Sequence, residues 1–439
     1  MLSIVNKIRN VLSRKKPTEI SPNTSTTQQI VKASSYGLTA KKIQPHVVKI
    51  IQRLEQAGFE AYIVGGGVRD LLLNIPPKDY DIATNAHPEQ IRKLFRNCRL
   101  IGRRFRLAHI YFHDDIVEVA TFRGSDINPT DNHLSDNGMI LRDNVYGTLE
   151  EDVFRRDLTI NAIYYDVTGN ELIDFTGGLA DIKKHTFHLI GDPAARYRED
   201  PVRILRVIRF AAKLNFKIAP STAEPINELK ELLLHVSSSR VFEEILKLFF
   251  SGHAQATLTQ LTKYDLLTLL FPSLKILPKE LKTSANSLTS IGCSNTDIRY
   301  ADGRSLNPAF LFAVILWQSY EHRLIRHLEQ HENRAVAQHH ALNELFQEQI
   351  AVAAIPKRFT SIMAEMWLMQ PRFEHRDKKR AMSLFEHPRF RAAYDLLLLR
   401  KEAGEPIEDL TSWWTSFQAA ENRDRQAMFI KRPMVKRKK

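Results

Sequence analysis

The chain has 439 residues, of which 43% are hydrophobic and 26% are charged, and its formal net charge is +13 at pH 7. This length allows two or three ordinary domains, and the hydrophobic content excludes a disordered chain. The positive excess favours a polyanionic partner, nucleic acid first and an anionic membrane surface second. Cys98 and Cys293 belong to no CxxC pattern, which argues against a disulfide framework or a structural zinc site and indicates a reducing compartment.

The N-terminal residues 1–42 are expected to be a flexible, basic segment. Residues 17–35 are rich in Ser, Thr, Pro, Asn and Gln, which is typical of a linker. Residues 1–16 place apolar side chains at helical spacing beside Lys and Arg. A frayed amphipathic end explains that pattern, and peripheral membrane contact through residues 1–16 is the alternative.

Order is expected to begin near Ile43 with an amphipathic helix over residues 45–58. Several short apolar runs that follow alternate apolar and polar residues, as strands packed on one face do. These runs span residues 61–64, 80–84, 99–101, 107–112 and 116–122. Helical patterns at 67–73 and 88–96 interrupt them, so this part is α+β, with helices packed on a small mixed sheet.

A polar stretch over residues 124–148 predicts a long loop, and the pattern becomes helical almost throughout from about residue 196. Helices are expected over residues 200–214, 240–250 and 387–403. The last nine residues contain six Lys or Arg and predict a solvated basic tail.

The strongest chemical signal is the sequence Lys78-Asp79-Tyr80-Asp81. Alternate residues of a strand face the same side, so Asp79 and Asp81 should point together. Two carboxylates this close repel unless a cation lies between them, and Mg²⁺ often takes one or two carboxylates plus substrate phosphates. A D-x-D also arises by chance on surface strands and turns, so its context decides.

Three consecutive glycines supply that context, because Gly65, Gly66 and Gly67 follow the strand at 61–64 and open a helix. Glycines let backbone N–H groups approach phosphate closely, and a helix N-terminus favours an anion. The segment is neither a dinucleotide fingerprint nor a P-loop. A tight strand-to-helix turn is the simpler explanation, but most turns need fewer glycines. Arg69, on the first helical turn, could reach a triphosphate.

A third acid, Glu118, is the polar residue of an apolar strand and would complete a carboxylate triad if that strand lies beside Asp79 and Asp81. Otherwise it is a solvent-facing strand residue. Two Mg²⁺ ions at such a triad would activate an RNA 3′-hydroxyl and neutralise a leaving pyrophosphate, so no Ser, Cys or His nucleophile is required. Asp79 is the best candidate to assist deprotonation.

Two further polar segments lie at the starts of helical patterns. Asp157 follows two arginines and either caps a helix or meets a ribose hydroxyl or the metal site. Arg203, Arg206 and Arg209 recur every three residues, so they form one stripe on a helix that Asp200 begins. The stripe either faces phosphates or is a salt-bridged solvent face, and Asp200 with Arg203 could present an acceptor and donors to a base edge.

Taken in order, five motifs resemble those of the class II nucleotidyltransferase family, which comprises bacterial poly(A) polymerases and CCA-adding tRNA nucleotidyltransferases. They are GGGVRD at 65–70, KDYD at 78–81, RRDLTIN at 155–161, DFTGGLADI at 174–182 and EDPVRILR at 199–206. Residues 102–106, GRRFR, resemble the poly(A) polymerase branch, and the resemblance extends over nearly the whole chain from residue 43.

The resemblance implies a role for each motif. Asp79 and Asp81 would hold two Mg²⁺ ions, with Glu118 or Asp157 as the third essential acid, and Asp157 would also handle the ribose. Asp200 and Arg203 would read the base, and Asp174 with Gly177 and Gly178 would lie in a hinge. The triphosphate would be held by Gly65, Gly66, Arg69, Arg156, Arg206 and Arg209.

The implied domains are a nucleotidyltransferase head at 43–178, a nucleotide-selecting helical neck at 179–252, a helical body with the RNA-binding region at 253–424 and a tail at 425–439. The implied reaction adds AMP from ATP to RNA 3′ ends in the cytoplasm, as in bacterial RNA turnover, with no role for DNA. Candidate RNA contacts are Arg103, Arg104, Lys357 and Arg358.

Three alternatives remain. The first is a CCA-adding tRNA nucleotidyltransferase, and the second is a catalytically silent RNA-binding protein. The third concerns His327 and His331, which have the i, i+4 spacing of a zinc pair but lack the glutamate of an HExxH motif.

Overall fold

The computed structural model describes residues 28–102, 106–112, 115–124, 145–278, 281, 284–330 and 333–429. The chain divides into two compact units, Met1–Ile182 and Lys183–Lys439. Several predictions lie outside the described residues: the membrane-surface helix at 1–16, Arg103, Arg104, His331, most of the 124–148 loop and the basic tail after residue 429.

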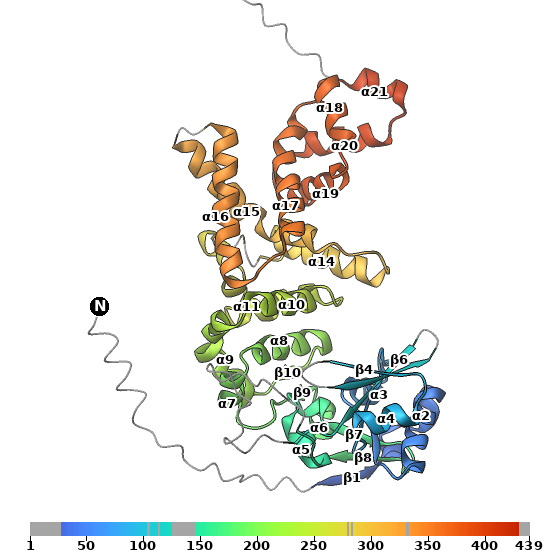
Figure 1. Ribbon diagram of the computed structural model, residues 1–439. Coiled ribbons are helices and arrows are strands. Elements are labelled where there is room, and N and C mark those ends of the chain that lie inside the picture. Colours follow the sequence, from blue (N-terminus) through green and yellow to red (C-terminus); the bar gives the residue numbers. More distant parts are fainter. Residues whose placement is uncertain are drawn as a thin grey trace, which may run out of the picture. The chain divides into compact units, whose positions relative to one another are not determined.

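The first unit is built on an eight-stranded mixed sheet (Figure 1). The strands lie in the order β1 (Gln29–Lys32), β8 (Glu171–Asp174), β7 (Ile163–Asp166), β2 (Ala61–Val64), β3 (Asp81–Thr84), β6 (Asp115–Thr121), β5 (Leu107–Phe112) and β4 (Cys98–Ile101). Neighbours β3 and β6 are parallel, and all other neighbouring pairs of this sheet are antiparallel. The predicted α+β class and its mixed sheet are therefore confirmed.

Helices pack on this sheet because each carries an apolar stripe. In α2 the buried side chains are Val47, Ile50, Ile51 and Leu54, which recur at helical spacing. The helices of this part are α2 (Pro45–Gln56), α3 (Gly66–Leu72), α4 (Pro88–Leu94), α5 (Leu149–Arg155) and α6 (Gly178–Lys184), with short 3₁₀ helices at Ala33–Tyr36, Ala40–Lys42 and Thr159–Asn161.

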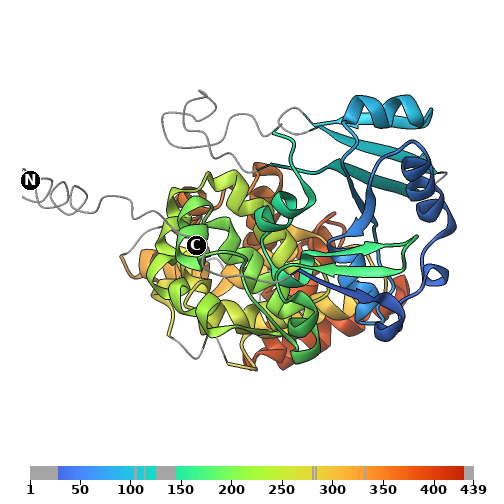
Figure 2. The same ribbon diagram turned by 90° about the horizontal axis from the view of Figure 1, so that it is seen from below.

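The predicted flexible segment is wrong for residues 28–42. Strand β1 pairs with β8, from Gln29 opposite Asp174 to Lys32 opposite Glu171, and Figure 2 shows this blue strand beside the green hairpin of β7 and β8. Backbone hydrogen bonding to an open sheet edge does not need an apolar sequence. The polar composition of this segment therefore did not exclude a strand, although it resembles that of a linker.

Asp174, the last residue of β8, accepts several backbone hydrogen bonds from the residues that follow it. Its Oδ1 accepts hydrogen bonds from the backbone N–H groups of Thr176, Gly177 and Gly178, at 2.9–3.1 Å, and its Oδ2 accepts one from Leu179 N at 2.9 Å. A Cβ on Gly178 would lie 2.3 Å from the carbonyl oxygen of Thr159, so only glycine fits there. The segment predicted as a hinge is thus tightly tied to the sheet at this end.

The second unit is almost entirely helical, apart from the parallel two-residue strands β9 (Thr186–Phe187) and β10 (Lys217–Ile218). Its first helices are α7 (Pro193–Glu199), α8 (Val202–Leu214), α9 (Pro220–Leu229), η4 (Lys230–His235), α10 (Ser238–Phe249), α11 (Ala254–Lys263), α12 (Leu267–Leu270), η5 (Pro272–Ile276) and α14 (Leu288–Ala301). Then come α15 (Pro308–Glu329), α16 (Arg334–Val352), α17 (Lys357–Met369), η6 (Gln370–Glu374), α18 (Lys378–Phe385), α19 (Phe390–Glu402), α20 (Glu408–Ala419) and α21 (Asn422–Met428). Within the described ranges, each helix is too short or too polar to span a bilayer.

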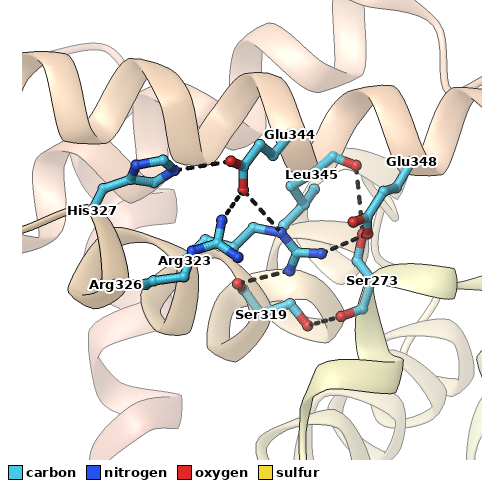
Figure 3. A network of polar contacts seen from close by, with 8 residues as sticks. All are labelled: Ser273, Ser319, Arg323, Arg326, His327, Glu344, Leu345 and Glu348. Atoms are coloured by element: carbon cyan, nitrogen blue, oxygen red, sulfur yellow. Dashed lines mark hydrogen bonds and ion pairs between the residues drawn. The ribbon is translucent and has the colours of Figure 1, made fainter. Parts of the chain in front are cut away.

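A polar network ties α15 to α16 (Figure 3). Arg323 is 3% exposed and donates from Nη2 to Glu348 at 2.5 Å and from Nη1 to the Ser319 carbonyl at 3.1 Å. His327 Nε2 lies 3.0 Å from Glu344 Oε1. This contact places His327 in the network, and no group of three or more potential metal ligands is found among the described residues.

Candidate active site

The two predicted carboxylates lie at the start of β3. Asp81 is the first residue of the strand and is half-buried, whereas Asp79 is exposed and precedes the strand by two residues. In the sheet, Asp81 stands opposite Val64 of β2 on one side and opposite Glu118 of β6 on the other. The structure therefore brings Glu118 opposite Asp81, which is the placement on which the sequence made a carboxylate triad depend.

The three acids influence one another electrostatically. Burial raises the pKa of Asp81, the charges of Glu118 and Asp79 raise it further, and Arg156 lowers it, with a net value of about 6. Gathered like charges of this kind favour a bound cation, because a cation removes the repulsion that raises the pKa. The described residues contain no group of three or more potential metal ligands, but Mg²⁺ often takes only one or two carboxylates together with substrate phosphates, so Asp79 and Asp81 could hold it.

The three glycines shape the turn around these acids. Gly65 has φ +77°, and a Cβ there would lie 3.2 Å from Asp81 Oδ2. A Cβ on Gly67 would lie 3.3 Å from the carbonyl oxygen of Asp79. The turn is therefore free of side chains where it passes the carboxylate of Asp81 and the backbone of Asp79, which is more than a plain strand-to-helix turn requires.

Arg69 is 2% exposed and is held inside the protein. Its Nε and Nη2 donate to Asp70 Oδ1 at 2.8 and 2.6 Å, and its Nη1 donates to Asn161 Oδ1 at 2.7 Å. A Cβ on Gly66 would lie 3.4 Å from Arg69 Nη2, so the guanidinium lies directly against the glycine turn. This geometry indicates that Arg69 supports the glycine turn and does not extend far toward a ligand.

Arg156 follows α5 and lies over the ring of Tyr164, with 5.2 Å between the guanidinium carbon and the ring centroid. Its Nε donates to the Tyr164 hydroxyl at 2.9 Å, and its Nη2 donates to Asp152 Oδ2 at 2.8 Å. Its Nη1 lies 3.9 Å from the position of a Cβ on Gly65. Arg156 is thus aimed at the turn beside Asp81.

Asp157 is half-buried in the bend between α5 and the 3₁₀ helix Thr159–Asn161. That short helix begins after Leu158, so Asp157 is not its N-cap residue. Glu118 lies opposite Asp81 on β6, where its Oε1 is 3.5 Å from His109 Nε2 and its side chain is 45% exposed.

The sequence interpretation missed the groups that hold the two arginines, namely Asp70, Asn161, Asp152 and Tyr164. The spacing of Asp152 and Arg156, four residues apart on the expected polar segment, was an available signal. Tyr164 gave none, because its strand reads as an ordinary apolar run.

In the helical unit, Asp200 stands at the start of α8. Its Oδ1 accepts from Val202 N at 3.2 Å, and its Oδ2 accepts from Arg240 Nη2 of α10 at 2.7 Å. Arg203 donates from Nη1 to the Arg196 carbonyl at 2.9 Å and to Glu199 Oε2 at 3.0 Å. The predicted start of the helix at Asp200 is two residues early, because α8 begins at Val202 with Pro201 as its N-cap residue, and Asp200 is the C-cap residue of α7.

The arginine stripe of α8 is half-buried at all three positions, Arg203, Arg206 and Arg209. The guanidinium carbon of Arg209 is 5.0 Å from the centroid of the Phe210 ring. Two other candidate RNA contacts, Lys357 and Arg358, are exposed at the start of α17. The guanidinium carbon of Arg358 lies 4.9 Å from the centroid of the Phe359 ring.

Family models match in the order that the motifs predicted. The Poly A polymerase head domain matches residues 61–188, the probable RNA and SrmB-binding site of polymerase A matches residues 215–277, and the polymerase A arginine-rich C-terminus matches residues 330–439. The chain therefore belongs to the poly(A) polymerase family of nucleotidyltransferases.

The similarity is strongest with one branch of that family. Poly(A) polymerase I of Salmonella typhi is 44% identical over 434 residues, which cover 97% of this chain and 93% of that protein. The CCA-adding enzyme of Streptococcus uberis is 40% identical over only 210 residues, 48% of this chain and 50% of that enzyme. A crystal structure of the Bacillus stearothermophilus CCA-adding enzyme in complex with CTP has a TM-score of 0.56 at 25% identity and covers 86% of this chain and 83% of that one.

Proposed function

We propose that the chain transfers AMP from ATP to RNA 3′ ends without a template and releases pyrophosphate, as a polynucleotide adenylyltransferase. The observation that carries the proposal is the 44% identity with Poly(A) polymerase I over 97% of the chain. The match to CCA-adding enzymes at comparable identity stops near half the chain, which makes that activity the runner-up.

In the proposed reaction, the RNA 3′ oxygen attacks the α-phosphorus of ATP. A phosphodiester bond forms, the α–β anhydride bond breaks, and pyrophosphate leaves with the electron pair. The proton of the 3′-hydroxyl passes to Asp79, which is exposed and precedes β3. No covalent intermediate with the protein is needed.

Asp79 and Asp81 are the residues that would hold Mg²⁺, and Glu118 would support them from β6. When bound, the ions lower the pKa of the 3′-hydroxyl and neutralise charge on the leaving pyrophosphate. The protein's own contribution is position and charge: Gly65 and Gly66 leave space for phosphate oxygens, Arg69 supports the turn, and Arg156 supplies a cation.

The remaining roles are proposed from the same family resemblance. Asp157 meets the ribose, and Arg206 and Arg209 help to hold the triphosphate. Asp200 and Arg203 read the adenine edge, and Lys357 and Arg358 contact RNA phosphates in company with Arg103 and Arg104. Replacing Arg203 by Ala is expected to lower the preference for ATP over CTP; an unchanged preference would refute its role in base reading.

The test is nucleotide use by the purified chain. With Mg²⁺, ATP and an RNA bearing a 3′-hydroxyl, long A tails and one pyrophosphate per added nucleotide are expected, with little incorporation from CTP. Addition that stops after CCA on a tRNA lacking those nucleotides would instead establish the runner-up. If neither A tails nor CCA ends are formed, the remaining alternative is a catalytically silent RNA-binding protein.

The cellular place is a separate proposal. A cytoplasmic enzyme acting on RNA in bacterial RNA turnover, with no use of DNA, fits the family and the positive net charge. Flotation with anionic vesicles, comparing the full chain with one lacking residues 1–16, tests peripheral membrane contact.

A further inference from the structure

We propose that Tyr164 and Asp152 are positioning residues that fix the guanidinium of Arg156 beside the glycine turn. The inference rests on the proposed function, because it assigns these two residues to the same site. Neither residue would touch the nucleotide; each would act through Arg156.

The three side chains each contact the other two. Arg156 donates to both partners, and the Tyr164 hydroxyl donates in turn to Asp152 Oδ2. The other carboxylate oxygen, Asp152 Oδ1, accepts from the backbone N–H of Arg123 at 3.1 Å. Asp152, which lies in α5, is therefore also held by the backbone just after β6. This second contact restrains the Asp152 carboxylate if the Arg156 side chain moves.

Burial makes this set rigid. Tyr164 is 0% and Asp152 6% exposed, while the Arg156 side chain keeps 25% exposure. Burial raises the pKa of Tyr164, so the phenol keeps its proton and remains a donor. Burial alone would raise the pKa of Asp152, but Arg156 and the Tyr164 hydroxyl hold it below its usual range, so it stays ionised.

The direction of the guanidinium distinguishes this set from ordinary packing. Nε and Nη2 point to the buried partners, and Nη1 lies beside Gly65. A Cβ on the same glycine would lie 3.2 Å from Asp81 Oδ2, so Arg156 and the Asp81 carboxylate lie against the same turn. An arginine with two of its nitrogens fixed loses less side-chain entropy on meeting an anion, and small displacements of such a group cost much activity.

The neighbouring residue Tyr165 provides a matched control. It lies on the same strand, is also 0% exposed, and its hydroxyl donates to Asn170 Oδ1 at 3.0 Å. Adjacent strand residues face opposite sides of a sheet, so Tyr165 points away from Arg156. Tyr164→Phe and Tyr165→Phe therefore each remove one buried hydroxyl, but only the first loosens Arg156.

The experiment measures kcat and KM for ATP in RNA elongation, affinity for a nonhydrolysable ATP analogue, and thermal stability, in both variants and in Asp152→Asn. We expect kcat/KM to fall about 10-fold or more in Tyr164→Phe and further in Asp152→Asn, and to change less than about twofold in Tyr165→Phe. Both Phe variants should lose similar thermal stability. Affinity for RNA should stay unchanged.

Equal kcat/KM in Tyr164→Phe and Tyr165→Phe would overturn the inference, whatever the stabilities. If the unaltered chain does not elongate RNA, the proposed function fails, and the analogue then decides the inference separately. Weaker analogue binding in Tyr164→Phe alone would support it, and equal binding in both variants, or none by the unaltered chain, would overturn it.

Discussion

The two units each contain a group of charged side chains, and the groups are built in opposite ways. In the head, Asp79, Asp81 and Glu118 bring like charges together, and the pKa of Asp81 rises to about 6. In the helical unit, the buried Arg323 is matched by Glu348 at 2.5 Å and by Glu344 at 3.9 Å (Figure 3).

This difference separates charges that stabilise a fold from charges held ready for a ligand. A buried arginine with two carboxylates satisfies its hydrogen bonds within the protein. An acid whose pKa is raised by burial and by neighbouring acids instead costs stability until a cation binds. The first three predictions below alter one group or the other, and the last alters two exposed cations of the helical unit. They run from the largest expected effect to the smallest.

Replacing Asp81 by Asn should nearly abolish AMP transfer. The variant loses one of the two carboxylates proposed to hold Mg²⁺, and a loss of about 10³-fold in kcat is expected from removing several kcal/mol of charge stabilisation. Steady-state rates of pyrophosphate release measure it. Asp115→Asn is the control, since Asp115 begins the neighbouring strand β6, three residues before Glu118, and pairs with His46 at 2.9 Å. A rate for Asp81→Asn near that of the control would contradict the account.

Replacing Arg323 by Met should destabilise the helical unit by about 2–3 kcal/mol, because two carboxylates lose a buried cationic partner. Urea denaturation followed by circular dichroism measures the change. Arg326→Met is the matched control: that side chain is 44% exposed and also pairs with Glu344, so its loss should cost less than about 1 kcal/mol. Equal losses would show that the burial of Arg323 contributes nothing.

Asp81→Asn should also be more stable than the unaltered chain at neutral pH without metal. The folded chain takes up the Asp81 proton near pH 6, and the unfolded chain does so near 3.9. Between these values the folded state binds more protons, so stability falls as pH rises through the window. The variant should gain about 1–2 kcal/mol at pH 8 and nothing below pH 4. Denaturation in EDTA at both pH values tests this, and a variant less stable at pH 8 would contradict the sign.

Replacing Lys357 and Arg358 by Ala should weaken RNA binding modestly and without regard to sequence. Each lost phosphate contact should make the slope of log K against log salt shallower by about 0.7 for single-stranded RNA. Fluorescence anisotropy across salt concentrations measures the slope. A slope equal to that of the unaltered chain would remove both residues from the RNA contact.

Much of the head was predictable from sequence, because its strands alternate and its motifs are local. The run Leu107–Phe112 was predicted with the residue limits that the structure shows. The polar positions Asp81 and Glu118 were singled out from their apolar strands, but that these strands are neighbours came from the structure. The edge strand at residues 29–32 was missed, because its stability comes from a distant partner, β8, and not from its own composition.

The support of the site was harder to foresee than the site itself. Arg69 was predicted to reach toward a triphosphate, yet it is buried by Asp70 and Asn161, the second of which is 92 residues away in sequence. Tyr164 reaches Arg156 only because β7 pairs with β2 in the sheet. Such contacts depend on register between strands, which local patterns do not fix.

The most direct test of the central claim is binding of Mn²⁺, a magnesium substitute visible by electron paramagnetic resonance, in the presence of a nonhydrolysable ATP analogue. We expect the unaltered chain and Asp115→Asn to bind Mn²⁺ alike, and the Asp79→Asn, Asp81→Asn double variant to lose most of that binding. A double variant that binds Mn²⁺ as tightly as the unaltered chain and still lengthens RNA at the same rate would contradict the account.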